Sequence, residues 1–129
     1  MKLLSELPPN IDNSIVSIGV FDGVHLGHQF LFDRLRKSAS EQSKSSVIIT
    51  FKNHPMSVIN KKFQPKFLMT LSERLENLSS TGVDSVIPIT FDNELAKLSA
   101  KKFLSILKDK INLSQIVAGP DFALGRNRE

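Results

Sequence analysis

Runs of apolar, often β-branched residues alternate along this chain with longer stretches of helical periodicity. Four runs of this kind predict strands, at residues 15–21, 47–51, 83–89 and 116–118. Helices are predicted between them, over 24–42, from Thr70 to Gly82, and after Ser99. Because each pair of strands is separated by enough residues to hold a helix, the alternation predicts an α/β fold with a parallel sheet and flanking helices.

Local patterns support two of these helix starts. Thr70 and Glu73 form a capping box, in which each side chain accepts a hydrogen bond from the other residue's backbone N–H. Ser99 is a suitable N-cap for the third helix, because its hydroxyl can accept from a free backbone N–H. The polar stretch 53–67, which contains proline, is predicted to be a loop.

Composition excludes several classes of protein. The 129 residues fit one domain, and 40% hydrophobic and 23% charged residues are values of a globular chain. Without cysteine there is no disulfide framework, and without a long apolar run there is no predicted membrane span or signal peptide. We therefore expect a cytoplasmic location and no membrane partner. The net charge of +4 is scattered, so no nucleic-acid partner is expected; the oligomeric state stays open.

The predicted topology also indicates where a ligand would bind. In parallel α/β sheets, ligands lie beyond the carboxyl ends of the strands. Four segments should therefore share one edge of the molecule, at residues 21–28, 52–58, 90–93 and 119–126.

The first of these segments has the most informative residues, Gly-Val-Phe-Asp-Gly-Val-His-Leu-Gly-His from Gly19 to His28. It lies where a strand meets the start of a helix, and backbone N–H groups at a helix start attract anions. His25 and His28 are three residues apart, so on a helical turn they project to one side and can donate hydrogen bonds to a polyphosphate. A structural pair of histidines, or a metal site with His54 as third ligand, remains an alternative.

The sequence His25-Leu-Gly-His28 matches the His-x-Gly-His signature of the nucleotidyltransferase superfamily, and the longer string resembles the form found in bacterial FAD synthetases. Further segments resemble this family in the same order. They are Thr50–Pro55, 71–84, 91–103 and Val117–Gly125. The resemblance covers about residues 15–126 and implies a Rossmann-like fold of the nucleotidyltransferase type.

The resemblance also implies roles for individual residues. His25 and His28 would be catalytic, contacting the ATP phosphates and stabilising the transition state. The implied ATP-binding residues are Gly19, Phe21, Asp22, Gly23, His25, Gly27, His28, Gly119 and Asp121. The implied flavin-binding residues are His54, Pro55 and Phe122. Without the family, His54-Pro55 is equally well a loop marker and the segment after Gly119 a simple turn.

The implied reaction is the transfer of AMP from ATP to FMN, which gives FAD and pyrophosphate. Mg²⁺ is expected to accompany ATP; Asp22 and Asp121 are the nearest acidic candidates, and no metal ligand is assigned. Two alternatives stay open. One is another nucleotidyltransferase of the cytidylyl or pantetheine-phosphate type, and the other is a nucleotide- or flavin-binding module without catalysis.

Three departures from the family pattern bear on these expectations. Asn53 replaces the usual proline of a Pro-His-Pro loop, and Ala123 and Leu124 replace a basic and an aromatic residue. The family's later Ser-Ser/Thr segment with its arginine is not found before Glu129. We therefore expect residues 1–129 to be a partial, truncated FMN adenylyltransferase domain, without a riboflavin kinase domain and with impaired activity in isolation.

Overall fold

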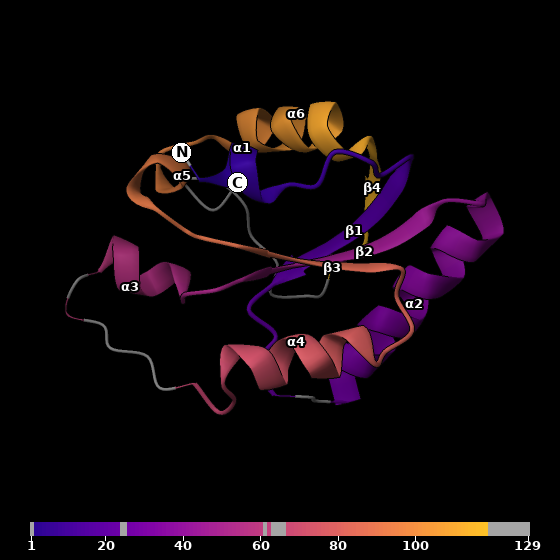
Figure 1. The fold of residues 1–129 in the computed structure, drawn as a ribbon, viewed down its shortest axis with the longest axis horizontal. Helices are drawn as coiled ribbons and strands as arrows, with labels where there is room; N and C mark the ends of the chain where they lie inside the picture. Colours follow the sequence, from indigo (N-terminus) through magenta and orange to yellow (C-terminus); the bar gives the residue numbers. More distant parts are fainter. Residues whose placement is uncertain (1, 24–25, 61, 63–66, 119–129) are drawn as a thin grey trace.

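A computed structural model describes residues 2–23, 26–60, 62 and 67–118. Its sheet contains four strands, all parallel, in the order β3-β2-β1-β4. Their bounds are β1 Ser14–Gly19, β2 Ser45–Phe51, β3 Ser85–Ile89 and β4 Leu113–Ile116. The predicted α/β fold class is confirmed (Figure 1).

Helices cover both faces of this sheet (Figure 1). The helices are α1 Leu3–Glu6, α2 Leu26–Gln42, α3 Pro55–Ile59, α4 Leu71–Ser79, α5 Asn93–Ala96 and α6 Ala100–Ile111. α2 and α4 lie on one face, whereas α1 and α6 lie on the other. The alternating side chains of the strands therefore enter two separate cores.

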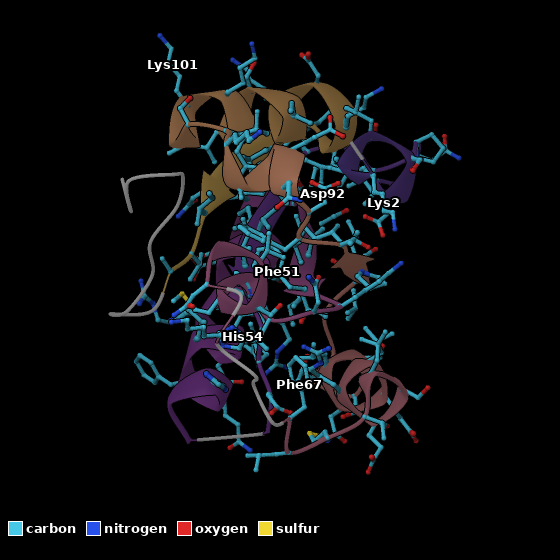
Figure 2. All side chains as sticks on the ribbon, turned by 90° about the vertical axis from the view of Figure 1, so that its left-hand side faces the viewer. Lys2, Phe51, His54, Phe67, Asp92 and Lys101 are labelled. Atoms are coloured by element: carbon cyan, nitrogen blue, oxygen red, sulfur yellow. The ribbon has the colours of Figure 1, made fainter. Side chains whose placement is uncertain are left out.

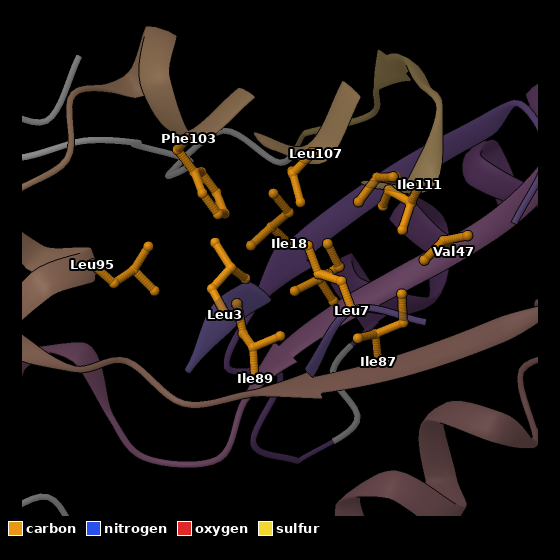
Figure 3. Packing of buried hydrophobic residues seen from close by; sticks show 12 residues of the cluster. Leu3, Leu7, Ile18, Val47, Ile87, Ile89, Leu95, Phe103, Leu107 and Ile111 are labelled. Carbon is orange, nitrogen blue, oxygen red and sulfur yellow. The ribbon is translucent and has the colours of Figure 1, made fainter. Parts of the chain in front are cut away.

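The larger core lies between the sheet and the α1, α5 and α6 side (Figure 3). Val16 and Ile18 of β1 point into it, and Leu107 of α6 packs against them without exposed surface. The core on the opposite face contains Ile15 of β1 and Leu35 of α2. Burial on both faces explains why β1 and β2 have continuous apolar runs.

The capping predictions are confirmed. The Thr70 hydroxyl accepts from the Glu73 backbone N–H, and the Glu73 carboxylate accepts from the Thr70 N–H, both at 3.1 Å. Ser99 caps α6 by accepting from the Lys102 N–H at 3.2 Å. No helix in the described ranges is long and apolar enough to cross a membrane.

Four details differ from the predictions. α1 and α5 were not predicted, because helices of four residues have too few positions for a periodic pattern. The stretch 53–67 is not only loop, since Pro55 occupies the first turn of α3 and His54 is its N-cap. β4 begins at Leu113, earlier than the predicted 116–118. The prediction missed its first residues because Ser114 and Gln115 are exposed polar residues of an edge strand and interrupt the apolar pattern.

Candidate active site

The carboxyl ends of β1 and β4 lie at the point where the chain reverses its direction through the sheet. The chain moves from β1 to β2 and β3 on one side, and then crosses to β4 on the other side of β1. In open parallel sheets this reversal leaves a crevice in which ligands bind. The segment after β1, which contains the two predicted catalytic histidines, starts at this position.

The loop after β1 has a conformation that its glycines and aromatic ring explain. Phe21 has φ +54° and Gly23 has φ +91°, so the chain turns sharply immediately after the strand. The Phe21 ring folds back over Gly19, where an added Cβ would lie 2.9 Å from a ring carbon. Gly19 is thus required by the packing of Phe21, whatever ligand the loop binds.

Phe21 also positions the ring of His28. The two rings meet edge to face, with centroids 5.4 Å apart, and Phe32 packs against Phe21 in the same manner at 5.0 Å. His28 lies in the first turn of α2 and is partly buried. These contacts hold the imidazole near the start of the helix, where the helix dipole favours an anion.

The backbone carbonyl of Val20 anchors this loop to the rest of the sheet. It accepts a hydrogen bond from the Thr50 hydroxyl at 2.8 Å and one from Arg74 Nη1 at 3.0 Å. Thr50 and Arg74 are both buried, with 0% and 1% of their surface exposed. Side chains of β2 and α4 therefore both hold the loop after β1, through the carbonyl oxygen of Val20.

Asp22 contacts backbone amides, which sequence reasoning did not foresee. Its two carboxylate oxygens accept from the backbone N–H groups of Leu68 and Met69, the latter at 3.0 Å. The segment before α4 is thereby attached to the loop after β1. An ionised carboxylate makes stronger hydrogen bonds than a neutral acceptor, so Asp22 is well suited to this role.

His54 also has a structural contact at the predicted flavin side. Its Nδ1 accepts from the Met56 backbone N–H at 3.1 Å, which caps α3. In the neutral ring the proton therefore lies on Nε2. Pro55 follows at a position where its missing N–H costs no hydrogen bond. The His54 and Phe67 rings lie 6.4 Å apart, at the end of the molecule that faces the viewer in Figure 2.

Asn53, which departs from the family pattern, joins two neighbouring loops. Its side-chain amide donates to the Phe91 carbonyl and its side-chain oxygen accepts from the Phe91 N–H, both at 2.9 Å. This reciprocal pair holds the segment after β2 against the segment after β3. A proline at this position could make neither bond.

A further polar cluster joins α1 to the same edge. Glu6 accepts from Lys52 Nζ at 2.8 Å and from the backbone and hydroxyl of Thr90 at 2.8 and 2.9 Å. Burial raises the pKa of Glu6, but the hydrogen bonds and the charge of Lys52 outweigh burial, so the pKa lies below its ordinary value. Glu6 is therefore ionised at neutral pH.

Arg74 is the main residue that sequence reasoning missed. Burial lowers the pKa of Arg74 and the charge of Asp22 opposes this shift. A signal was present in the sequence. Arg74 is three residues after Leu71 and four before Leu78, so it belongs to the apolar stripe of α4, where a charged residue is unusual.

Several predicted residues lie outside the described part of the chain. They are His25, Gly119, Asp121, Phe122, Ala123 and Leu124. Gly27 falls in the first turn of α2. The structure thus brings Gly19, Phe21, Asp22, Gly23 and His28 together at the carboxyl end of β1, and places His54 and Pro55 after the neighbouring strand β2.

The described residues do not form a metal centre of their own. No group of three or more His, Asp or Glu side chains in the described ranges is arranged to hold a metal ion. Both oxygens of Asp22 accept backbone hydrogen bonds. Among the described residues, Asp22 is therefore already occupied by backbone donors, and no metal ligand is assigned.

Comparison with known proteins identifies the family. The model of the FAD synthetase family matches residues 7–129. The chain belongs to the FAD synthetase family. Among curated relatives, a bifunctional riboflavin kinase/FMN adenylyltransferase of Buchnera aphidicola (from Schizaphis graminum) is 40% identical over 90% of this chain. The Escherichia coli K12 protein of the same name is 32% identical over 98% of the chain.

The FAD synthetase match covers only part of each relative. The chain spans 38% of the Buchnera protein and 40% of the Escherichia coli protein. A crystal structure described as a macrolide-efflux protein from Streptococcus pneumoniae superposes with a TM-score of 0.83, at 27% identity. It covers 98% of this chain, which spans 43% of that protein. The parallel α/β fold implied by the sequence thus agrees with a solved structure over 98% of this chain.

Proposed function

We propose that this chain is an FMN adenylyltransferase, which transfers AMP from ATP to FMN and releases pyrophosphate. The observation that carries the proposal is the segment Gly19–His28, which lies at the reversal point of a parallel sheet in a member of the FAD synthetase family. The curated relatives are named for this activity together with riboflavin kinase activity. The proposal for this chain concerns adenylyl transfer alone.

In the proposed reaction, a terminal oxygen of the FMN phosphate attacks the α-phosphorus of ATP. The bond between that phosphorus and the α–β bridging oxygen breaks, and the electron pair leaves with pyrophosphate. No protein nucleophile is needed, so the protein contributes alignment of the two substrates and stabilisation of negative charge. Mg²⁺ bound to the ATP substrate would neutralise part of the charge on its phosphates.

The residues have separate tasks in this proposal. His28, with His25, donates hydrogen bonds to the ATP phosphates, while the Phe21 ring holds His28 in place. Gly23 and the start of α2 supply backbone donors close to the phosphates. His54 and Pro55 contact FMN. The family pattern adds Phe122 to the flavin-binding residues and Gly119 and Asp121 to the ATP-binding residues; these three lie outside the described part of the chain.

The direct test is a reaction of this chain with FMN, Mg²⁺ and ATP, separated by chromatography to detect FAD and pyrophosphate. We expect both products in equal amounts, above a control without protein. Parallel reactions replace ATP by CTP, and FMN by pantetheine phosphate, and these should give no product. FMN or ATP binding by titration without FAD would instead establish a binding module. Product only with CTP or pantetheine phosphate would assign a different nucleotidyltransferase.

A further inference from the structure

We propose that Arg74 is a positioning residue that sets the loop after β1 and the loop after β2 at a fixed separation. The proposal deepens the proposed function, on which its kinetic part rests. Arg74 Nη1 donates to the Val20 carbonyl at 3.0 Å, and Nη2 donates to the Lys52 carbonyl at 3.4 Å. Val20 directly follows β1, and Lys52 directly follows β2, so one guanidinium spans the ends of two neighbouring strands.

The burial of Arg74 is the reason to infer a specific task. Only 1% of its surface is exposed, and a guanidinium loses much hydration free energy when it is buried. An apolar side chain of similar size at this position of α4 would fill the same space without this loss of hydration free energy. A planar guanidinium can bond two carbonyls at a set distance, which neither an apolar residue nor a lysine does in the same way.

Two further contacts compensate the buried charge and extend the connection. The guanidinium carbon of Arg74 lies 5.0 Å from the centre of the Phe67 ring, a distance typical of a cation–π contact. The negative charge of Asp22 attracts it, while the Asp22 oxygens accept from the Leu68 and Met69 amides. Arg74 is thus surrounded by the loop after β1, the loop after β2 and the segment before α4.

These two loops would hold different substrates. The loop after β1 leads to His28 on the ATP side, and the loop after β2 leads to His54 on the FMN side. Transfer requires the attacking oxygen and the α-phosphorus to meet in line, and a displacement of about 1 Å can cost about a hundredfold in rate. Arg74 should therefore act on the catalysed step more than on the binding of either substrate alone.

The test compares Arg74→Met, which keeps the length without the donors, with Arg74→Lys. The control is Arg36→Met, because Arg36 is an exposed arginine of α2 that pairs with Asp33. The melting temperatures are measured first, and kcat and both KM values are then measured well below the lowest of them. We expect Arg74→Met to lower kcat between about tenfold and a hundredfold, with KM changes of about threefold or less. Arg74→Lys should recover part of kcat, and Arg36→Met should match the parent chain.

A purely structural role would give another pattern. If Arg74→Met retains kcat within twofold of the parent, or if both variants lose activity only in proportion to their melting temperatures, the proposal is wrong. Should Arg74→Met not fold, Arg74→Lys, which cannot bond both carbonyls in the same geometry, takes its place, and normal kcat in Arg74→Lys would overturn the proposal.

Amide hydrogen exchange separates this proposal from the proposed function. In Arg74→Met, the amides of residues 21–23 and 53–54 should exchange faster than in the parent chain and in Arg36→Met. This comparison needs no turnover, so it remains decisive if the parent chain forms no FAD. Unchanged exchange in both loops would contradict the positioning role, even if FAD is formed.

Discussion

The two edges of the sheet are stabilised by different kinds of side chain. At the amino edge, connections are short: Asn112 alone separates α6 from β4, and its side chain donates to the Ile11 carbonyl. The hydroxyl of Ser14 donates to the Ile111 carbonyl at 2.8 Å, and Ser46 pairs with Asp84. Small hydroxyl and amide groups, with one carboxylate, complete these turns.

The carboxyl edge has longer connections and more charge. Charged side chains hold the loops there, namely those of Arg74, Asp22, Glu6 and Lys52. The exposed apolar side chains Met56, Phe67 and Leu68 follow β2 on the same side. Loops that only connect elements need neither buried charges nor exposed apolar surface. The amino edge thus has the features of simple connections, whereas the carboxyl edge combines buried charge with exposed apolar surface, as loops that carry a function often do.

The largest expected effect is that of His28→Ala on turnover. Loss of a hydrogen-bond donor to transition-state charge typically costs about a hundredfold or more in kcat, and the loss of ATP affinity should be smaller. Gln29→Ala, an exposed neighbour on α2, is the matched control. The measurement is steady-state FAD formation together with an ATP titration. Unchanged turnover in His28→Ala would refute the assigned role.

Asn53→Ala should have the next largest effect, which is a loss of stability that arises at the carboxyl edge. It removes two hydrogen bonds and leaves the Phe91 N–H and carbonyl without that partner, at a cost of about 1–3 kcal/mol. Urea unfolding measures this loss, and Asn93→Ala in the exposed first turn of α5 serves as control. Equal stability of the two variants would show that the Asn53–Phe91 pair is not significant.

A pair of substitutions in β2 sharpens the comparison of the two edges. Thr50 and Ser46 lie on one face of the same strand, close to opposite ends. Thr50→Val and Ser46→Ala should each lower the free energy of unfolding by about 1 kcal/mol, because each removes hydrogen bonds of a hydroxyl. Only Thr50→Val should also lower kcat, since Thr50 holds the Val20 carbonyl. Equal loss of kcat in both variants would remove the functional distinction between the edges.

The smallest expected effect is a pH dependence that arises from Glu6. Its pKa in the folded chain lies below the ordinary 4.5, so its contribution to stability is complete above that pH and is lost as pH falls through the folded value. Glu6→Gln should therefore be less stable than the parent by about 1 kcal/mol at pH 7, with the difference shrinking below pH 4.5. Urea unfolding at several pH values checks this, and a constant difference would contradict it.

The sequence predicted those parts of the fold that depend on residues close together in the chain. The strands β1 to β3 and the caps at Thr70 and Ser99 follow from local patterns, and their alternation predicted the parallel sheet. The helix α3 and strand β4 were missed or misplaced, because one turn of helix and a half-exposed edge strand have weak patterns.

The candidate site was predictable in its place, but not in its connections. The motif from Gly19 to His28 predicted a junction between a strand and a helix, and the structure has β1 and α2 at this place; its role as a ligand site stays a prediction. The hydrogen bonds of Arg74 and Asp22 join residues 22 to 54 positions apart, such as Lys52 with Arg74 and Val20 with Arg74. Pairings at this distance come from the tertiary fold. The sequence signal for them was the unusual position of Arg74 in the apolar stripe of α4.

Mapping of backbone amide chemical shifts during titration with Mg²⁺-ATP tests the central claim most directly. We predict that the shifts concentrate after β1 and β4, at residues 20–23, 28 and 117–118. The amino edge, at residues 43–46 and 112, should change little. Shifts centred on the amino edge, or no shifts at millimolar ATP, would contradict the assignment of the carboxyl edge as the nucleotide site.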